Sequence, residues 1–255
     1  FIYKTEIRGA IQPSTASHLK RMIGDAKSST RVSAILIELD TPGGMLEPTR
    51  EIVSEILASE VPVITYVSPS GARAGSAGTF IVAASHIAAM APTTNIGAAT
   101  PVGASGEELG ETIKNKVSQD AAALLRSISE QRGRPSQELE MTVTEAKSYT
   151  SMEALKLGII DVISKNQISL LEEIDGFTVI TPDGNITMET SNLKTQIFKR
   201  TMLEKFLDAV GDPNITFVLL TIGSIALTLE FIQPGILIGG FIGILAISLA
   251  FAGMG

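Results

Sequence analysis

The sequence contains no cysteine and only two histidines, His18 and His86. The absence of cysteine excludes disulfide bonds, zinc–thiolate sites and a cysteine nucleophile together. A basic stripe is also missing: 20 basic and 27 acidic residues give a formal net charge of −7. This balance argues against a nucleic-acid partner. We expect no cofactor and no metal ion. The chain starts at Phe1 rather than at a methionine, so we expect that a signal segment has been removed or omitted.

The C-terminal region lacks charge. Between Ile215 and Gly255, the one charged residue is Glu230. A helix over residues 235–255 would be about 31 Å long, which matches a bilayer core of about 30 Å. We therefore predict a transmembrane hairpin over residues 215–255 that turns at Gln233-Pro234-Gly235. Three glycines are available for close packing of its helices, namely Gly239, Gly240 and Gly243.

Residues 193–214 connect this hairpin to the rest of the chain and mix basic with apolar side chains. Two interpretations remain open: an amphipathic helix on lipid headgroups, or a solvated connecting helix. By the positive-inside rule, the basic residues place this side in the cytoplasm. They are Lys194, Lys199, Arg200 and Lys205.

The N-terminal region alternates apolar strand-like runs with helix-like segments. The strands are expected at 1–7, 34–39, 63–67, 86–91 and 159–163, and the helices at about 14–28, 48–58, 79–84, 116–132 and 151–158. This order predicts an α/β layered fold with right-handed crossovers. The domains are expected at 1–172 for the α/β part, 173–192 for a β-hairpin extension, 193–214 for the linker and 215–255 for the membrane hairpin.

A glycine-rich turn, Pro69–Phe80, presents Ser76 at the start of a predicted helix. Backbone N–H groups and the positive end of the helix dipole would lie beside a serine placed there. A nucleophile whose reaction develops an oxyanion needs this environment. The alternative is an ordinary serine N-cap, and the G-x-S-x-G elbow pattern is not matched.

A serine nucleophile needs a base, and neither histidine fits. His86 would lie roughly 15 Å from Ser76 on a continuous helix, and His18 is expected at the surface among Lys20 and Arg21. The remaining choice is a lysine, which acts as a base only when it is neutral and therefore desolvated. A polar, glycine-rich segment, Gly103–Gly110, is expected to be a mobile loop, and Lys114 and Lys116 both follow it. Lys116 could bury itself against the apolar face of the helix that follows. The alternative is that both lysines are solvated.

Three motifs occur together and in order: Asp40–Gly44, Gly71–Gly78 and Glu153–Asp161. In this respect the chain resembles the Clp-protease-like serine peptidases, and most closely the long NfeD family of membrane-bound stomatin operon partner proteins. The resemblance implies a Clp-protease/crotonase-like layered β-α superhelical domain that cleaves peptide bonds with a Ser-Lys dyad. It assigns Ser76 as nucleophile and Lys116 as general base. It also implies an oxyanion hole formed by Gly43, Gly44 and Ala77.

The same resemblance implies partners and a location. The expected partners are a hydrophobic peptide or membrane-protein substrate, a stomatin-type protein, the lipid bilayer and a second copy of the chain. The location implied is a prokaryotic cell membrane with the catalytic domain outside the cytoplasm, which conflicts with the basic linker. Arg73 stands where the family often has a small residue. Long family members carry more membrane helices and a soluble C-terminal domain, so the chain resembles a truncated form.

The substrate is expected to bind as an extended strand along small-residue backbone, at Asn95, Ile96, Gly97 and Ala98. Two other functions remain open. A signal peptide peptidase A-like protease would share the fold and the dyad, although its anchor lies N-terminal. A catalytically inactive Clp-like scaffold would bind stomatin-type partners without cleaving them.

Overall fold

The structure is a computed structural model, and it describes residues 1–103, 110–233 and 238–254. The chain divides into two compact units. The first comprises Phe1–Ile11 and Leu19–Lys199, and the second comprises Gln12–His18 and Arg200–Gly255. The loop predicted at 103–110 and the turn after Gln233 lie largely outside the described residues.

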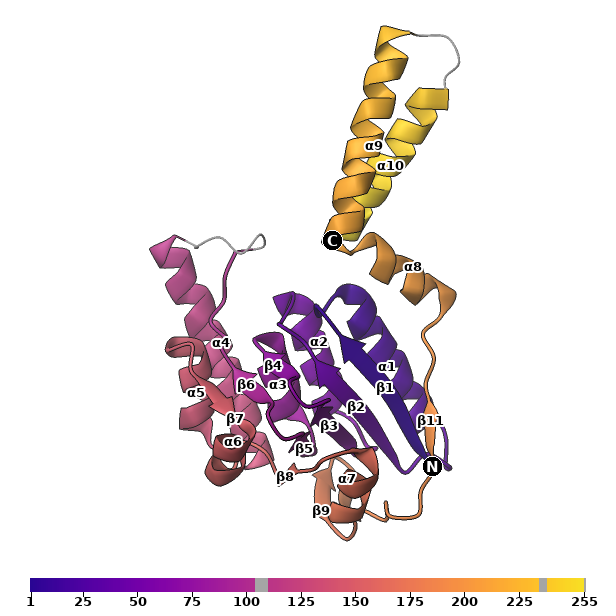
Figure 1. The fold of residues 1–255 in the computed structure, drawn as a ribbon. Coiled ribbons are helices and arrows are strands. Elements are labelled where there is room, and N and C mark those ends of the chain that lie inside the picture. The colour runs from indigo at the N-terminus through magenta and orange to yellow at the C-terminus, as the bar shows by residue number, and fades with distance from the viewer. Residues whose placement is uncertain (104–109, 234–237, 255) are drawn as a thin grey trace. The chain divides into compact units, whose positions relative to one another are not determined.

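A six-stranded sheet forms the centre of the first unit, in the order β11-β1-β2-β3-β5-β8. Every neighbouring pair in it is parallel. Figure 1 shows β1, β2 and β3 side by side. The buried runs of β2 and β3 place these strands inside the sheet, as continuous apolar character predicts. The strand bounds are β1 Ile2–Arg8, β2 Ala34–Asp40, β3 Val63–Val67, β5 Ile87–Met90, β8 Val162–Ile163 and β11 Thr195–Ile197.

The helices of the α/β part connect these strands. α2 buries Ile52, Val53 and Ile56, the 3/4 spacing expected of one apolar face. α4 begins at Glu111, five residues before the predicted start, and it ends at Gly133, whose φ of 67° gives the left-handed C-cap. The bounds are α1 Pro13–Lys27, α2 Leu46–Leu57, α3 Ala77–Ala84, α4 Glu111–Arg132, α5 Ser136–Thr144, α6 Ser151–Leu157 and α7 Gln167–Glu173.

One face of the sheet is covered by α7 and a β-hairpin. The hairpin joins β9 (Thr178–Thr181) to β10 (Gly184–Thr187), with Pro182 and Asp183 between the strands, and it lies within the segment 173–192 where a β-hairpin is predicted. Its side chains pack with those of α7 and of the strands in one apolar cluster, which includes Ile2, Leu36, Ile64, Tyr66, Leu170, Ile174, Val179 and Met188. Tyr66 belongs to this cluster, and its hydroxyl donates a hydrogen bond to the Ser164 carbonyl at 2.8 Å.

A second, three-stranded sheet has the order β4-β6-β7. Its strands are β4 Arg73–Gly75, β6 Asn95–Gly97 and β7 Ser148–Thr150. β6 is therefore paired on both sides, with β4 in parallel and with β7 antiparallel. The expectation that a peptide strand adds to Asn95–Gly97 is wrong, because neither edge of this strand is free.

The second unit contains α8 (Met202–Val210) and two apolar helices, α9 (Pro213–Ile232) and α10 (Ile238–Met254). α9 carries a 19-residue apolar stretch, Asn214–Ile232, which is long enough to span a bilayer. The apolar stretch of α10, Ile238–Gly253, is shorter. Glu230 accepts hydrogen bonds from the N–H groups of Gly239 and Gly240 at 3.1 and 3.4 Å, so its carboxylate caps α10.

Glycines set the spacing of α9 and α10. A Cβ added to Gly243 would lie 2.6 Å from Leu227 Cγ, and one added to Gly223 would lie 2.6 Å from Ile247 Cγ1. A Cβ at Gly239 would lie 3.0 Å from the Ala226 carbonyl oxygen. Close packing at Gly239 and Gly243 confirms the prediction, whereas Gly240 makes an ordinary contact and Gly223 was not predicted.

His18 is not a surface residue, which corrects the expectation from its basic neighbours. Its side chain has no exposed area, and its Nδ1 lies 3.1 Å from Oε2 of Glu204, a residue 186 positions later in the chain.

Candidate active site

Ser76 lies where strand β4 turns into helix α3. It is the N-cap residue, with φ 46° and ψ −111°, a conformation that residues other than glycine rarely adopt. The turn is held by the Ser76 N–H, which donates to the Gly97 carbonyl at 3.0 Å, and by the Thr79 N–H, which donates to the Ser76 carbonyl at 2.9 Å. Strain of this kind is found at functional sites where the surrounding structure enforces it.

The loop after β2 packs directly on this turn. Thr41 bridges Ala74 in parallel, and the Arg73 N–H donates to a carboxylate oxygen of Asp40 at 3.1 Å. A Cβ at Gly43 would lie 2.7 Å from Ser76 Cβ and 3.2 Å from Ser76 Oγ. Two of the three motifs therefore meet around one serine side chain.

Of the three residues expected to form the oxyanion hole, two keep a donor available. The Gly43 N–H already donates to Thr41 Oγ1 at 3.0 Å. Ala77 is the first residue of α3, and an N–H there has no partner inside the helix. Within the described residues, the Gly44 N–H likewise makes no recorded hydrogen bond.

Lys116 does not lie at Ser76 in this structure. It belongs to the first turns of α4, where Glu111 to Lys116 are all exposed, and the first buried residue of that helix is Ala121. Among the described residues, no hydrogen bond joins Lys116 to Ser76. The expected burial of Lys116 against the apolar face of its own helix is wrong, because that face starts five residues later.

The predicted substrate residues split into two groups. Gly97 contacts the site, because its carbonyl accepts from the Ser76 N–H. Gly97 and Ala98 both have positive φ, 132° and 48°, so the chain turns sharply as it leaves β6. Asn95 and Ala98 are exposed and Ile96 is buried.

His86 lies at the opposite end of α3 from Ser76, directly before β5. Its Nδ1 accepts a hydrogen bond from the Val63 N–H at 3.1 Å. Burial, followed by the nearby Arg132 and Arg134, lowers the pKa of His86 to about 3. The strand was predicted to begin at His86 and begins one residue later, at Ile87. Among the described residues, no hydrogen bond joins His86 to Ser76.

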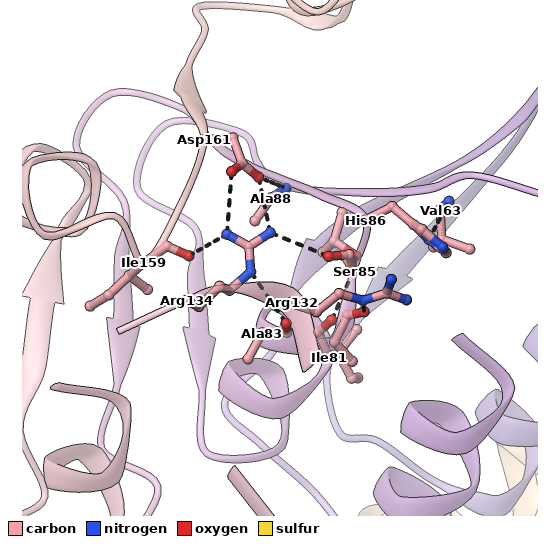
Figure 2. A network of polar contacts seen from close by, with 12 residues as sticks. Val63, Ile81, Ala83, Ser85, His86, Ala88, Arg132, Arg134, Ile159 and Asp161 are labelled. Atoms are coloured by element: carbon pink, nitrogen blue, oxygen red, sulfur yellow. Dashed lines mark hydrogen bonds and ion pairs between the residues drawn. The ribbon is translucent and has the colours of Figure 1, made fainter. Parts of the chain in front are cut away.

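Two arginines hold this far end of α3, and sequence reasoning missed both. Arg132 is the last residue of α4 and Arg134 follows its C-cap, positions that do not indicate a contact with another helix. Arg134 donates to the carbonyls of Ala83 and Ser85, and its guanidinium lies 2.9 Å from the Asp161 carboxylate (Figure 2). Arg132 donates to the Ala84 carbonyl at 2.7 Å. Cations at a helix C-terminus are stabilising, so this network fixes the helix whose other end presents Ser76.

The arrangement fits the chemistry of nucleophilic attack on a carbonyl, with a serine at a helix N-terminus and N–H donors beside it. The described residues contain no group of three or more His, Asp or Glu that could hold a metal ion.

Two parts of the chain match the models of known protein families. Residues 1–175 match the model of the NfeD1b N-terminal domain, and residues 214–255 match the NfeD integral membrane domain. The chain belongs to the NfeD family. Its membrane segment is the one that the charge-free C-terminal region predicted.

Relatives of known sequence agree with this assignment. The chain is 36% identical over 258 residues to the membrane-bound protease PH1510 of Pyrococcus horikoshii, covering all of this chain and 58% of that protein. It is 28% identical to the membrane protein NfeD1b of Bacillus subtilis, covering 99% of this chain and 56% of that protein. The chain thus spans less than two thirds of the length of these relatives.

Solved structures confirm the predicted fold. A lysine-to-alanine mutant of the 1510-N membrane-bound stomatin-specific protease, in complex with a substrate peptide, matches with a TM-score of 0.73 and 34% identity over 81% of this chain and 95% of that one. A serine-to-alanine mutant of the same protease matches with a TM-score of 0.72 and 34% identity over 79% of this chain and 98% of that one. The α/β part therefore has the Clp-like protease fold.

Proposed function

We propose that this chain is a membrane-anchored serine endopeptidase that cleaves hydrophobic peptide segments, with a stomatin-type membrane protein as its substrate. The observation that carries the proposal is the strained Ser76 at the N-terminus of α3, with Gly43 against its side chain. The specificity of the similar Pyrococcus protease for a stomatin homologue supports the substrate.

In the proposed reaction, Ser76 Oγ attacks the carbonyl carbon of the scissile bond while Lys116 Nζ takes the hydroxyl proton. The oxygen of the tetrahedral intermediate accepts hydrogen bonds from the N–H groups of Ala77 and Gly44. Lys116 then gives its proton to the leaving amine, and water releases the acyl group from Ser76 by the same steps. The mutants of the relative, one at a serine and one at a lysine, support this pair of roles.

The exposed position of Lys116 sets a condition on this mechanism. The first turns of α4 must bring the amine to Ser76 and remove it from water when substrate is bound, because only a neutral amine accepts a proton. The same observation favours a second candidate function, in which the chain is a noncatalytic scaffold that binds a stomatin-type protein.

A serine-directed fluorophosphonate probe separates the two functions. We expect the full chain in detergent to be labelled, Ser76→Ala to lose labelling, and Lys116→Ala to lose both labelling and peptide cleavage. Lys114→Ala is the matched control, since it removes an exposed lysine from the same part of α4, and it should keep both activities. If the full chain is folded but is not labelled, the proposed protease function is refuted and the scaffold function remains.

The substrate preference is tested with a peptide library. We expect cleavage at apolar segments. Equal cleavage of charged and apolar peptides would contradict that substrate preference but would still support the proposed protease activity.

We place the α/β part outside the cytoplasm, following the family. Because the chain has no cysteine, a single cysteine at exposed Glu172 reports the side. A membrane-impermeant maleimide should label Glu172→Cys in intact cells. Labelling only after lysis would show that the α/β part lies in the cytoplasm instead.

A further inference from the structure

Helix α8 exposes an apolar face. Met202, Leu203 and Phe206 are 81, 66 and 49% exposed, and Leu207 is 39% exposed. Residues three and four positions apart, such as Leu203 with Phe206 and Met202 with Phe206, lie on one side of a helix. A helix that packs against a protein core buries its apolar side. In α8, by contrast, the apolar side is the exposed one.

The polar side of α8 is the one that contacts protein. Glu204 is buried, lies 3.1 Å from His18 Nδ1 and accepts from the Thr201 N–H at 2.8 Å. On the next turn, Asp208 accepts a hydrogen bond from Ser14 and pairs with Arg200 at 2.6 Å. These contacts, all within the second unit, fix the rotation of α8 against Ser14 and His18, and the apolar side chains lie on the other side of the helix.

The end of α8 lies at the end of the membrane hairpin. Val210, its last residue, accepts a hydrogen bond at 2.9 Å from the hydroxyl of Thr216, in the first turn of α9. A Cβ added to Gly253, near the end of α10, would lie 2.2 Å from the same Val210 carbonyl oxygen. The end of α8 therefore lies beside the first turn of α9 and the end of α10, the two ends of the segment that matches the NfeD integral membrane domain.

We propose that α8 is an interfacial membrane helix, with Met202, Leu203 and Phe206 inserted at the boundary between headgroups and acyl chains. Its continuity with the NfeD integral membrane domain, which begins at residue 214, selects lipid as the occupant of the apolar face. Lys205 is exposed on the same helix, and Lys199 and Arg200 precede it in the sequence. Basic residues beside an apolar face favour a membrane that contains anionic lipid.

The absence of native cysteine allows a direct test. Leu203→Cys and Phe206→Cys, each labelled with an environment-sensitive fluorophore, are reconstituted as full chains in vesicles of phosphatidylcholine and phosphatidylglycerol. Lipids that carry a nitroxide near the headgroup report contact with the bilayer, and iodide reports contact with water. Phe217→Cys on α9, 70% exposed, is the lipid-facing control, and Glu172→Cys on α7 is the solvated one.

We expect the fluorophores at 203 and 206 to be quenched by the nitroxide lipid, to emit at shorter wavelength than at 172, and to resist iodide. Quenching should weaken when phosphatidylglycerol is left out. Iodide quenching equal to that at 172 would overturn the proposal, and so would resistance to both quenchers, which would mean that a second copy or another protein covers the face. Met202→Cys repeats the measurement if either variant fails to insert.

Discussion

The contact between Gly43 and Ser76 gives the sharpest test of the site. In Gly43→Ala, the new Cβ would lie 2.7 Å from Ser76 Cβ, at a residue whose φ is 129°. Real Cβ atoms do not approach so closely, so either the loop or the serine must move. We expect the reactivity of Ser76 to be lost while the fold persists.

Two unfavourable contributions to the free energy of folding add when Gly43 is replaced by alanine. A non-glycine residue in a sparsely populated backbone region costs about 1–3 kcal/mol, and overpacking of a tight contact costs about 1–3 kcal/mol. Gly71→Ala is the matched control: its φ is 87°, and an added Cβ meets nothing within 4 Å. It therefore carries the backbone cost without the contact with Ser76.

The assay is the rate of fluorophosphonate labelling, measured on full chains at a temperature where circular dichroism shows both variants folded. A displacement of the nucleophile by about 1 Å costs on the order of a hundredfold in rate, so Gly43→Ala should be slowed by that factor. Gly71→Ala should keep the normal rate with a slightly lower thermal midpoint. Equal labelling of the two variants would show that the close contact does not position Ser76.

Three further predictions follow from the same structure. Lys116→Arg should not restore the cleavage lost in Lys116→Ala, because a guanidinium stays charged at usable pH; substantial cleavage by the arginine variant would exclude Lys116 as the base. Arg134→Leu leaves the Asp161 carboxylate and several carbonyls without their cation and should cost about 3 kcal/mol of unfolding free energy in denaturant titrations; a loss near zero would contradict the role given to the network. The pKa of His86 is lowered from 6.5 to about 3, so the unfolded chain binds more protons, and stability should fall below pH 6.5 by at most about 1.4 kcal/mol per pH unit. His86→Asn should flatten that part of the pH profile, and an unchanged slope would assign it to other groups.

The strands of the α/β part could be predicted because their signals are local. The run 34–39 is apolar except for Glu38, the run 63–67 is apolar except for Thr65, and both are central parallel strands in the structure. α5 and α7, of nine and seven residues, were missed because they carry no extended apolar stripe. α6 has only seven residues as well, but the cap-like Thr150 at its start and Gly158 at its end made it predictable. The pairing of β6 on both sides could not be predicted, since β7 lies some fifty residues further along the chain.

Ser76 could be placed because glycines around a serine describe a turn without reference to the rest of the molecule. His18 could not be placed in this way. Its sequence neighbours Lys20 and Arg21 are typical of a solvated helix face, whereas the residue that it contacts, Glu204, lies 186 positions away. Burial of a polar side chain depends on its partner, and no local pattern identifies a partner so far along the chain.

Lys116 shows where local reasoning fails for catalysis. The apolar positions of α4 begin at Ala121, so the helix offers no surface that could desolvate an amine one turn earlier. A lysine that is to act as a base in this chain must therefore be removed from water by something other than its own helix. A bound hydrophobic peptide has that property, because it brings apolar surface to Ser76 when the proton must be taken. On this reasoning, the proposed preference for apolar substrates and the proposed activation of Lys116 as the base would have the same physical cause.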